Sequence, residues 1–314
     1  MNPINNILVI VDPTAELHPA VGKAALLARR LNARLELYVC DTKASREVRL
    51  ATHAGKRVDQ PLQVNLKAFL EDLAKPIREG GLDVTTEVEC ADPLPLHAAL
   101  VDRARRTTAD LIVKDTHHHS LGKRTFMTNT DWELIRACQV PLLLTKPNFW
   151  ASAPRVCAAV DPGHANDKPA VLDNRIVDYA ALLAKRLGGE LHLLHAYLPT
   201  TIVAAAAAGS PPMAMTVSGE DLAREADQKR ALLQDLVAEY RIAPSSVHLE
   251  VGGPAAVLPR AAGELRADIV AMGAISRSGF RRVFIGSTAE DVLEGLPCDA
   301  FIVRPPNFAD DLPF

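Results

Sequence analysis

The sequence predicts an α/β protein made of two tandem doubly wound domains, each with a five-stranded parallel sheet. Three observations predict it: the chain length, an internal repeat, and the alternation of strand-like with helix-like segments. The chain has 314 residues, which suffices for two domains of about 150 residues with a core each. We therefore expect one domain over residues 1–150 and a second over residues 151–314.

The repeat begins with the first strand and helix of each half. Residues 6–13 read NILVIVDP and residues 155–162 read RVCAAVDP; both are short apolar runs that end in Asp-Pro, which is typical of a buried parallel strand entering a loop. The segment AALLARRLNARLELYVC from Ala24 then matches AALLAKRLGGELHLLHAY from Ala180. Apolar residues at helical spacing, a turn and a second strand are expected in both.

The later part of each half repeats as well. VTTEVEC from Val84 and VHLEV from Val247 are strand-like, and DWELIRACQVPLLLTKPNF from Asp131 matches EDVLEGLPCDAFIVRPPNF from Glu290. Strands that alternate with helices predict a parallel sheet covered on both faces, because right-handed crossovers require those helices.

Two segments interrupt the repeat, and composition limits the function. Residues 41–66 and 199–219 both follow the second strand of their half, so we interpret them as equivalent, partly helical insertions.

The net charge is −3, from 35 basic and 38 acidic residues, which disfavours nucleic-acid or membrane-surface binding. No apolar run approaches the ~20 residues that span a bilayer, and a cytoplasmic location is expected. The five cysteines form no C-x-x-C pair and are interpreted as reduced thiols: Cys40, Cys90, Cys138, Cys157 and Cys298.

Ligands of open parallel sheets bind beyond the carboxyl ends of the strands, which in the second half directs attention to Asp161 and to the segment from Met272. That segment reads MGAISRSGFRRVFIGSTAEDVL. Glycine lets the backbone approach a phosphate, and Ser287 with Thr288 open a helix whose free N–H groups favour an anion. The spacing resembles the G-x-x-G, nine residues, G-[S/T] pattern of the universal stress protein family, with Ser276 in place of the second glycine.

The resemblance covers nearly the whole chain and points to tandem members of the UspE type, with the universal stress protein / adenine nucleotide alpha hydrolase-like fold. It implies ATP or another adenine nucleotide as the ligand of the second half. By this resemblance the ligand contacts are Asp161 on the adenine or ribose, Met272 and Gly273 on the sugar, and Ser276, Arg277, Gly286, Ser287 and Thr288 on the phosphates. The alternative is that Gly286 is a turn residue and Ser287-x-x-Glu290 a capping box without any ligand.

The first half departs further from the family pattern. The matching stretch is KDTHHHSLGKRTFMTNTDWEL, in which Asp115, His118 and Thr128 stand where the glycines would lie. A carboxylate and bulky side chains there predict that the first half does not bind ATP. Asp12, which ends the first strand, is interpreted as the start of an Asp-Pro turn.

Three consecutive histidines of the first half, His117, His118 and His119, are metal-ligand candidates, with Asp115 or Asp131 as further ligands. Neighbouring residues on one loop rarely bind one ion together, so no metal is expected. We favour a polar loop that fills the vacated pocket.

The chain has no phosphate-loop, nucleophile-elbow or H-E-x-x-H motif, so we expect a binding protein with at most slow ATPase activity. The leading hypothesis is a stress-response protein whose halves form an intramolecular pseudo-dimer, with a further homodimer left open. The alternative is a scaffold that binds another metabolite or an acyl chain, for which the alanine run of the second insertion and Met213 and Met215 would form an apolar lining.

Overall fold

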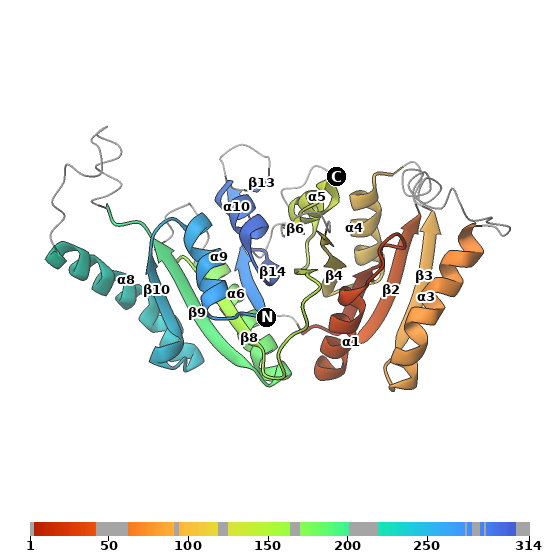
Figure 1. Ribbon diagram of the computed structural model, residues 1–314, viewed down its shortest axis with the longest axis horizontal. Helices are drawn as coiled ribbons and strands as arrows, with labels where there is room; N and C mark the ends of the chain where they lie inside the picture. The colour runs from red at the N-terminus through yellow and green to blue at the C-terminus, as the bar shows by residue number, and fades with distance from the viewer. Residues whose placement is uncertain are drawn as a thin grey trace. The chain divides into compact units, whose positions relative to one another are not determined.

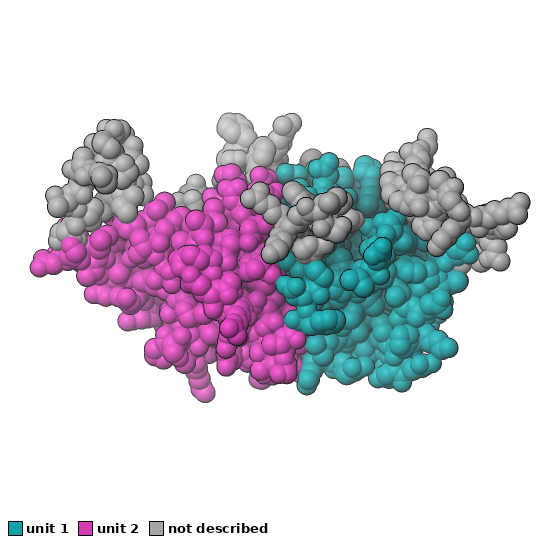
Figure 2. Space-filling model, in the orientation of Figure 1, with its two compact units in different colours: residues 1–149, 299–304, 308–314 teal, residues 150–298, 305–307 magenta. Residues whose placement is uncertain are grey.

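The computed structural model describes residues 3–41, 62–90, 94–118, 125–163, 170–200, 219–273, 275–277, 283–285 and 287–305 (Figure 1). Two compact units divide the chain, as Figure 2 shows in teal and magenta. Unit 1 consists of Met1–Phe149 with Asp299–Arg304 and Phe308–Phe314, and unit 2 consists of Trp150–Cys298 with Pro305–Asn307.

Unit 1 is a doubly wound α/β unit. Its main sheet contains five parallel strands in the order β3-β2-β1-β4-β7, and this order reverses beside β1, as in other doubly wound sheets. The elements are β1 (Asn6–Ile10), α1 (Pro19–Leu31), β2 (Arg34–Asp41), α3 (Leu62–Glu79), β3 (Val84–Cys90), α4 (Leu96–Arg106), β4 (Leu111–Asp115), α5 (Asn129–Ala137) and β7 (Leu142–Thr145).

Unit 2 repeats this winding with parallel strands in the order β10-β9-β8-β11. The elements are β8 (Arg155–Ala159), α6 (Ala170–Leu187), β9 (Glu190–Tyr197), α8 (Gly219–Tyr240), η2 (Pro244–Ser246), β10 (Val247–Val251), α9 (Pro254–Glu264), β11 (Ile269–Gly273) and α10 (Ser287–Gly295). The last strand, β14 (Asp299–Val303), is counted with unit 1, where it pairs antiparallel with β7. The predicted α/β class with tandem doubly wound domains is confirmed.

Apolar strands and two-sided helix packing explain the cores. Val9 and Val113 in unit 1 and Cys157 and Val270 in unit 2 have no exposed surface, as expected for strands covered on both faces. In unit 1, α4 and α3 cover opposite faces: Arg103 of α4 contacts Glu36, whereas Glu71 of α3 contacts Thr86, the residue after the cross-strand partner of Glu36.

The first helix of each half ends in the same way. Asn32 after α1 has φ 57° and Gly188 after α6 has φ 70°. Glycine, and to a lesser degree asparagine, adopts this left-handed conformation at low cost. The turn before the second strand is therefore conserved in geometry between the halves although the residue differs.

Two antiparallel hairpins follow the fourth strands, where the sequence suggested only loops. β5 (His117–His118) pairs with β6 (Thr125–Phe126), and β12 (Ile275–Arg277) pairs with β13 (Val283–Ile285). The interpretation of His117 and His118 as loop residues is therefore wrong. Of the predicted insertions, only residue 41 and the first residues of α3 in the first, and residues 199, 200 and 219 in the second, lie within the described residues.

The five cysteines, all within the described residues, are thiols and form no disulfide with one another. Four are buried and Cys90 is exposed; burial raises the pKa of the Cys138 thiol and of the Cys157 thiol to about 12. These thiols stay protonated at neutral pH and are poor nucleophiles.

Among the described helices, none combines the length and the apolar character needed to cross a bilayer.

Candidate nucleotide site

The strand ends of unit 2 bring several of the predicted site residues to one edge of the sheet. β8 and β11 are parallel neighbours, with Ile269 opposite Val156, so they end at the same edge. Asp161 follows β8, and β11 ends with Met272 and Gly273. Met272 is buried, whereas Asp161 and Gly273 are half-buried.

The hairpin after β11 explains the nine-residue spacer of the motif. Ile275 lies opposite Ile285, and Ser276 lies opposite Phe284. The chain therefore leaves Gly273, forms a short ribbon and returns next to its starting point at Ser287. Ser276 occupies an extended strand position that any residue adopts without strain, so a glycine is not needed there. Arg277 ends the same strand, and Gly286 lies outside the described residues.

Helix α10 starts at this returning end. Its first two residues, Ser287 and Thr288, are exposed, and the third is Ala289, which carries no polar side chain. The first turn of a helix has N–H groups without intrahelical partners and a positive dipole end. Ser287 is the first residue of α10, whereas a capping-box serine precedes the first helical residue, and Glu290 lies in the same first turn.

Polar side chains from other elements gather around the loop after β8. The backbone N–H of Asp161 donates to Asp173 Oδ1 at 3.1 Å, and His195 Nδ1 lies 2.9 Å from the carbonyl oxygen of Val160. Lys229 of α8 approaches the same loop. Sequence reasoning missed Asp173, His195 and Lys229, because they are far from the glycine motif in the chain and form no pattern of their own.

In unit 1 the corresponding helix start is filled by the protein's own charges. Thr128 caps α5 in a reciprocal box with Asp131, whose Oδ2 accepts from Thr128 N at 2.7 Å and from Thr128 Oγ1 at 2.8 Å. Lys114 Nζ lies 2.7 Å from Asp131 Oδ1, and the two side chains are 8% and 0% exposed. A carboxylate therefore occupies the place where a bound anion would meet α5.

Asp115, which stands at the position of Gly273, is also engaged. Its Oδ1 accepts from Thr145 Oγ1 at 2.6 Å and from the backbone N–H of Ala20, at the start of α1, at 2.8 Å. Burial raises the pKa of this carboxyl above its usual value, although the two hydrogen bonds and the nearby His18 and Lys114 act to lower it. Asp12 Oδ1 accepts from Thr14 N at 2.8 Å, which confirms the predicted turn.

Comparison with known proteins identifies the fold and the motif together. The model of the universal stress protein family matches residues 3–146 and again residues 155–304. These two matches cover most of the chain, one in each half. The chain belongs to the universal stress protein family.

Relatives of this universal stress protein share its tandem organisation. Universal stress protein E of Photorhabdus laumondii is 26% identical over 309 residues, 96% of both chains, and its namesake in Escherichia coli K12 is 26% identical over 306 residues, 96% of this chain and 95% of the relative. The predicted UspE-type resemblance is confirmed.

Two solved structures match the universal stress protein over nearly its whole length. A protein of unknown function from Pseudomonas aeruginosa PAO1 has a TM-score of 0.73 at 26% identity and covers 96% of this chain and 93% of its own. A universal stress protein from Archaeoglobus fulgidus has a TM-score of 0.67 at 18% identity, covering 96% and 98%. The second match shows a shared fold.

The side chains of the three consecutive histidines, which are the metal-ligand candidates, lie outside what the structure describes. His117 and His118 are placed as backbone only, and His119 lies outside the described residues. Among the described side chains, no group of three His, Cys, Asp or Glu residues could hold a metal ion. Asp131, the suggested acidic ligand, is ion-paired with Lys114.

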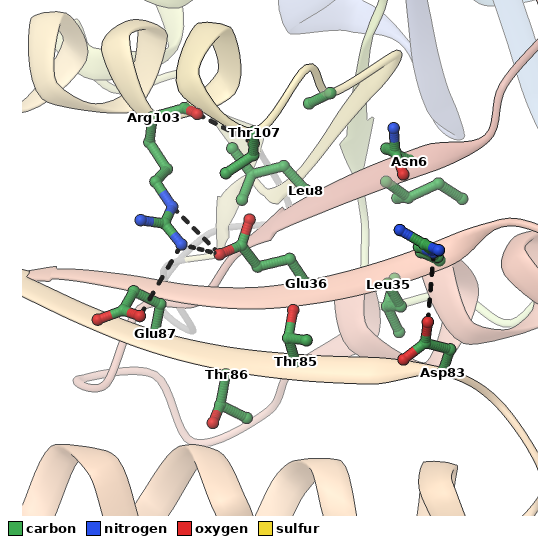
Figure 3. Close-up of a pocket in the computed structure, with 13 residues that line it drawn as sticks. Asn6, Leu8, Leu35, Glu36, Asp83, Thr85, Thr86, Glu87, Arg103 and Thr107 are labelled. Atoms are coloured by element: carbon green, nitrogen blue, oxygen red, sulfur yellow. Dashed lines mark hydrogen bonds and ion pairs between the residues drawn. The ribbon is translucent and has the colours of Figure 1, made fainter.

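A cleft of about 410 Å³ in unit 1 lies away from the predicted site (Figure 3). It opens at the amino ends of β1, β2 and β3, opposite to the edge that holds Asp115. Arg103 of α4 reaches Glu36 and Glu87 across it, and Arg34 pairs with Asp83 at its mouth. Three acidic side chains, Glu36, Asp83 and Glu87, outnumber two basic ones, Arg34 and Arg103, in the lining of the cleft. This excess of negative charge disfavours an anionic nucleotide.

Proposed function

We propose that this protein is a stress-response binding protein whose second half takes up ATP or a related adenine nucleotide. One observation carries the proposal. Both halves have a fourth strand, a hairpin and a helix in the same order, but the described start of α5 holds Asp131 and Lys114, whereas the first residues of α10 are Ser287, Thr288 and Ala289. An anion would thus meet a helix start that already holds the Lys114–Asp131 ion pair in one half. In the other half it would meet a start with small hydroxyl side chains, with Glu290 as the acidic residue of the first turn.

In this proposal the ligand lies along the edge formed by β8 and β11. The adenine or ribose contacts Asp161, the sugar contacts Met272 and Gly273, and the phosphates contact the hairpin and helix residues Ser276, Arg277, Gly286, Ser287 and Thr288. Arg277 supplies a positive charge for the phosphates. The buried Met272 fits an apolar contact with the sugar or base better than the buried Lys114 does in the first half.

We further propose that the halves form an intramolecular pseudo-dimer. The strand that ends the second half, β14, pairs antiparallel with β7, the strand that ends the first half, with Phe301 opposite Leu143. The first half then acts as a partner without a nucleotide of its own. The proposed output is binding and its consequences for partners, without catalytic turnover.

The proposal is tested by denaturing freshly purified protein and identifying the released small molecules by mass spectrometry. We expect an adenine nucleotide from the parent protein and none from Gly273→Asp, because a new carboxylate at the sugar contact takes up space and repels the neighbouring phosphates. Gly22→Asp is the matched control: Gly22 is exposed on α1 with open space around it, so the same charge is added in the first half.

Loss of the nucleotide in Gly22→Asp as well would assign the effect to charge or folding and contradict the proposed site. Another released molecule, such as a fatty acid, would favour the alternative of a scaffold with an acyl ligand. Absence of any nucleotide, together with failure of ATP to bind on titration, would overturn the proposal.

A further inference from the structure

His195 is a buried side chain with one unused hydrogen-bonding atom. It lies near the carboxyl end of β9 and is 2% exposed. Its Nδ1 is 2.9 Å from the carbonyl oxygen of Val160; a carbonyl only accepts, so Nδ1 carries the hydrogen. In the neutral ring Nε2 is then an acceptor, and this atom is buried without a hydrogen-bond partner.

The first half shows that the fold does not need a histidine here. Val11 N donates to Tyr38 O at 2.9 Å and Val160 N donates to Leu194 O at 3.0 Å, which makes the residue after Tyr38 the counterpart of His195. That residue is Val39, which is fully buried. The second half therefore has a polar imidazole ring at a position where the first half has an apolar valine side chain.

The surroundings of His195 are those of the candidate site. The charges that act on the ring belong to Asp161 in the loop after β8, Asp173 on α6 and Lys229 on α8. The ring of Tyr197 stacks beside it, with centroids 6.2 Å apart. Since Asp161 is the expected adenine or ribose contact, the ring of His195 is placed, under the proposed function, near the base end of the site.

We propose that His195 is the specificity-determining residue of this site and selects a base that presents an N–H donor, such as the amino group of adenine. This inference rests on the proposed nucleotide site. A 6-oxopurine presents a carbonyl oxygen at the same position, and two acceptors facing each other would leave both without a partner. Nε2 is shielded from solvent in the free chain, so the base displaces neighbouring atoms to reach it.

The protonation state of the ring gives the inference a second signature. Burial lowers the pKa of His195 below 6.5, with the carboxylates of Asp161 and Asp173 acting in the opposite direction. The ring is therefore neutral and accepts at neutral pH. Below its lowered pKa, Nε2 carries a proton and donates, which suits a carbonyl oxygen instead of an amino group.

The experiment compares the affinity for ATP with that for ITP, which differs by an oxygen in place of the amino group. We expect the parent to prefer ATP by about tenfold at neutral pH, the value of one well-placed hydrogen bond, and His195→Val to lose this preference. Valine is chosen because Val39 shows that the fold accepts it. His192→Gln is the control: His192 lies on the opposite face of β9, paired with His248.

The preference should fall in the parent, and not in His195→Val, as the pH is lowered through the depressed pKa of the His195 ring. An unchanged preference in His195→Val, or equal affinities in a parent whose ATP binding is lost in Gly273→Asp, would overturn the role of His195 while leaving the nucleotide site in place. Failure of the parent to bind either nucleotide would overturn both.

Discussion

The fourth strands of the two halves, β4 and β11, enter the same kind of hairpin but end differently. β4 ends in Lys114 and Asp115, which are tied to Asp131 and to Thr145. β11 ends in Met272 and Gly273, and the helix beyond it begins with small hydroxyl side chains. The comparison shows that the start of α5 has a negative charge supplied by the chain itself, from Asp131. Under the proposed function, a bound phosphate supplies that charge at the start of α10.

The two halves also differ at a second pair of equivalent positions, which lies away from the sheet edge. Glu36 on β2 is held by Arg103, whereas its counterpart His192 on β9 contacts His248, with Nδ1 and Nε2 3.1 Å apart. One half has a half-buried ion pair between a strand and a helix, and the other has a contact between imidazoles of two neighbouring strands. A single residue moved from one half to the equivalent position of the other would therefore lack its interaction partner.

The largest expected effect comes from breaking the ion pair that fills the first site. Asp131→Ala leaves the Lys114 ammonium buried without its partner, which costs about 3–5 kcal/mol of unfolding free energy. Urea unfolding followed by circular dichroism measures it. The double change Lys114→Met with Asp131→Ala removes both charges and should recover most of the loss because no lone charge remains.

A surface pair provides the control for that measurement. Asp221 and Arg224 lie 3.3 Å apart with side chains 51% and 70% exposed, and Asp221→Ala should cost less than about 1 kcal/mol. If Asp131→Ala were no more damaging than Asp221→Ala, the first helix start would not be held by its own charges.

A smaller effect is expected from the pH dependence of Asp115. Burial raises the pKa of this carboxyl in the folded chain above 3.8, so the native state keeps the proton that the unfolded state has released. Its contribution to stability is therefore present at low pH and is lost as the pH rises from 3.8 through the folded-state pKa. Asp115→Asn keeps an oxygen for Ala20 N and removes the titration.

The test is the difference in unfolding free energy between the parent and Asp115→Asn across that interval. Taking the difference between the two proteins removes the pH-dependent contributions of other groups, which are the same in both. Glu89 is such a group: hydrogen bonds from Arg106 lower its pKa to about 2, so its contribution changes with pH in the opposite direction. A difference that does not change with pH would show that Asp115 is ionised as easily in the folded chain as in the unfolded one.

Sequence reasoning predicted the fold because its signals are periodic and repeated. Apolar runs that end at Asp12 and Asp161, and the match of the helices after them, indicated both sheets. It also located the edge with Gly273 and Ser287. It missed the Lys114–Asp131 pair, although a lysine inside the apolar run LIVKD signals a buried partner, and it missed His195, whose importance depends on which atom is left unpaired in three dimensions.

The smallest expected effect concerns the departure of the second half from the family motif. Ser276 lies in an extended strand, where glycine has no conformational advantage. Ser276→Gly should change the affinity for ATP by less than about threefold, below 1 kcal/mol. A much tighter variant would mean that the serine side chain obstructs the phosphates, and the open character of the second site would be only partial.

The central claim is that the second half binds a nucleotide and the first does not, and calorimetric titration with ATP tests it most directly. The account predicts a single nucleotide per chain for the parent, unchanged stoichiometry for Asp115→Asn, and affinity for Gly273→Asp lowered by at least about tenfold, roughly 1.4 kcal/mol. The new carboxylate takes up space at the sugar contact and repels the neighbouring phosphates. Two nucleotides per chain, or binding that survives Gly273→Asp and is lost in Asp115→Asn, would contradict it.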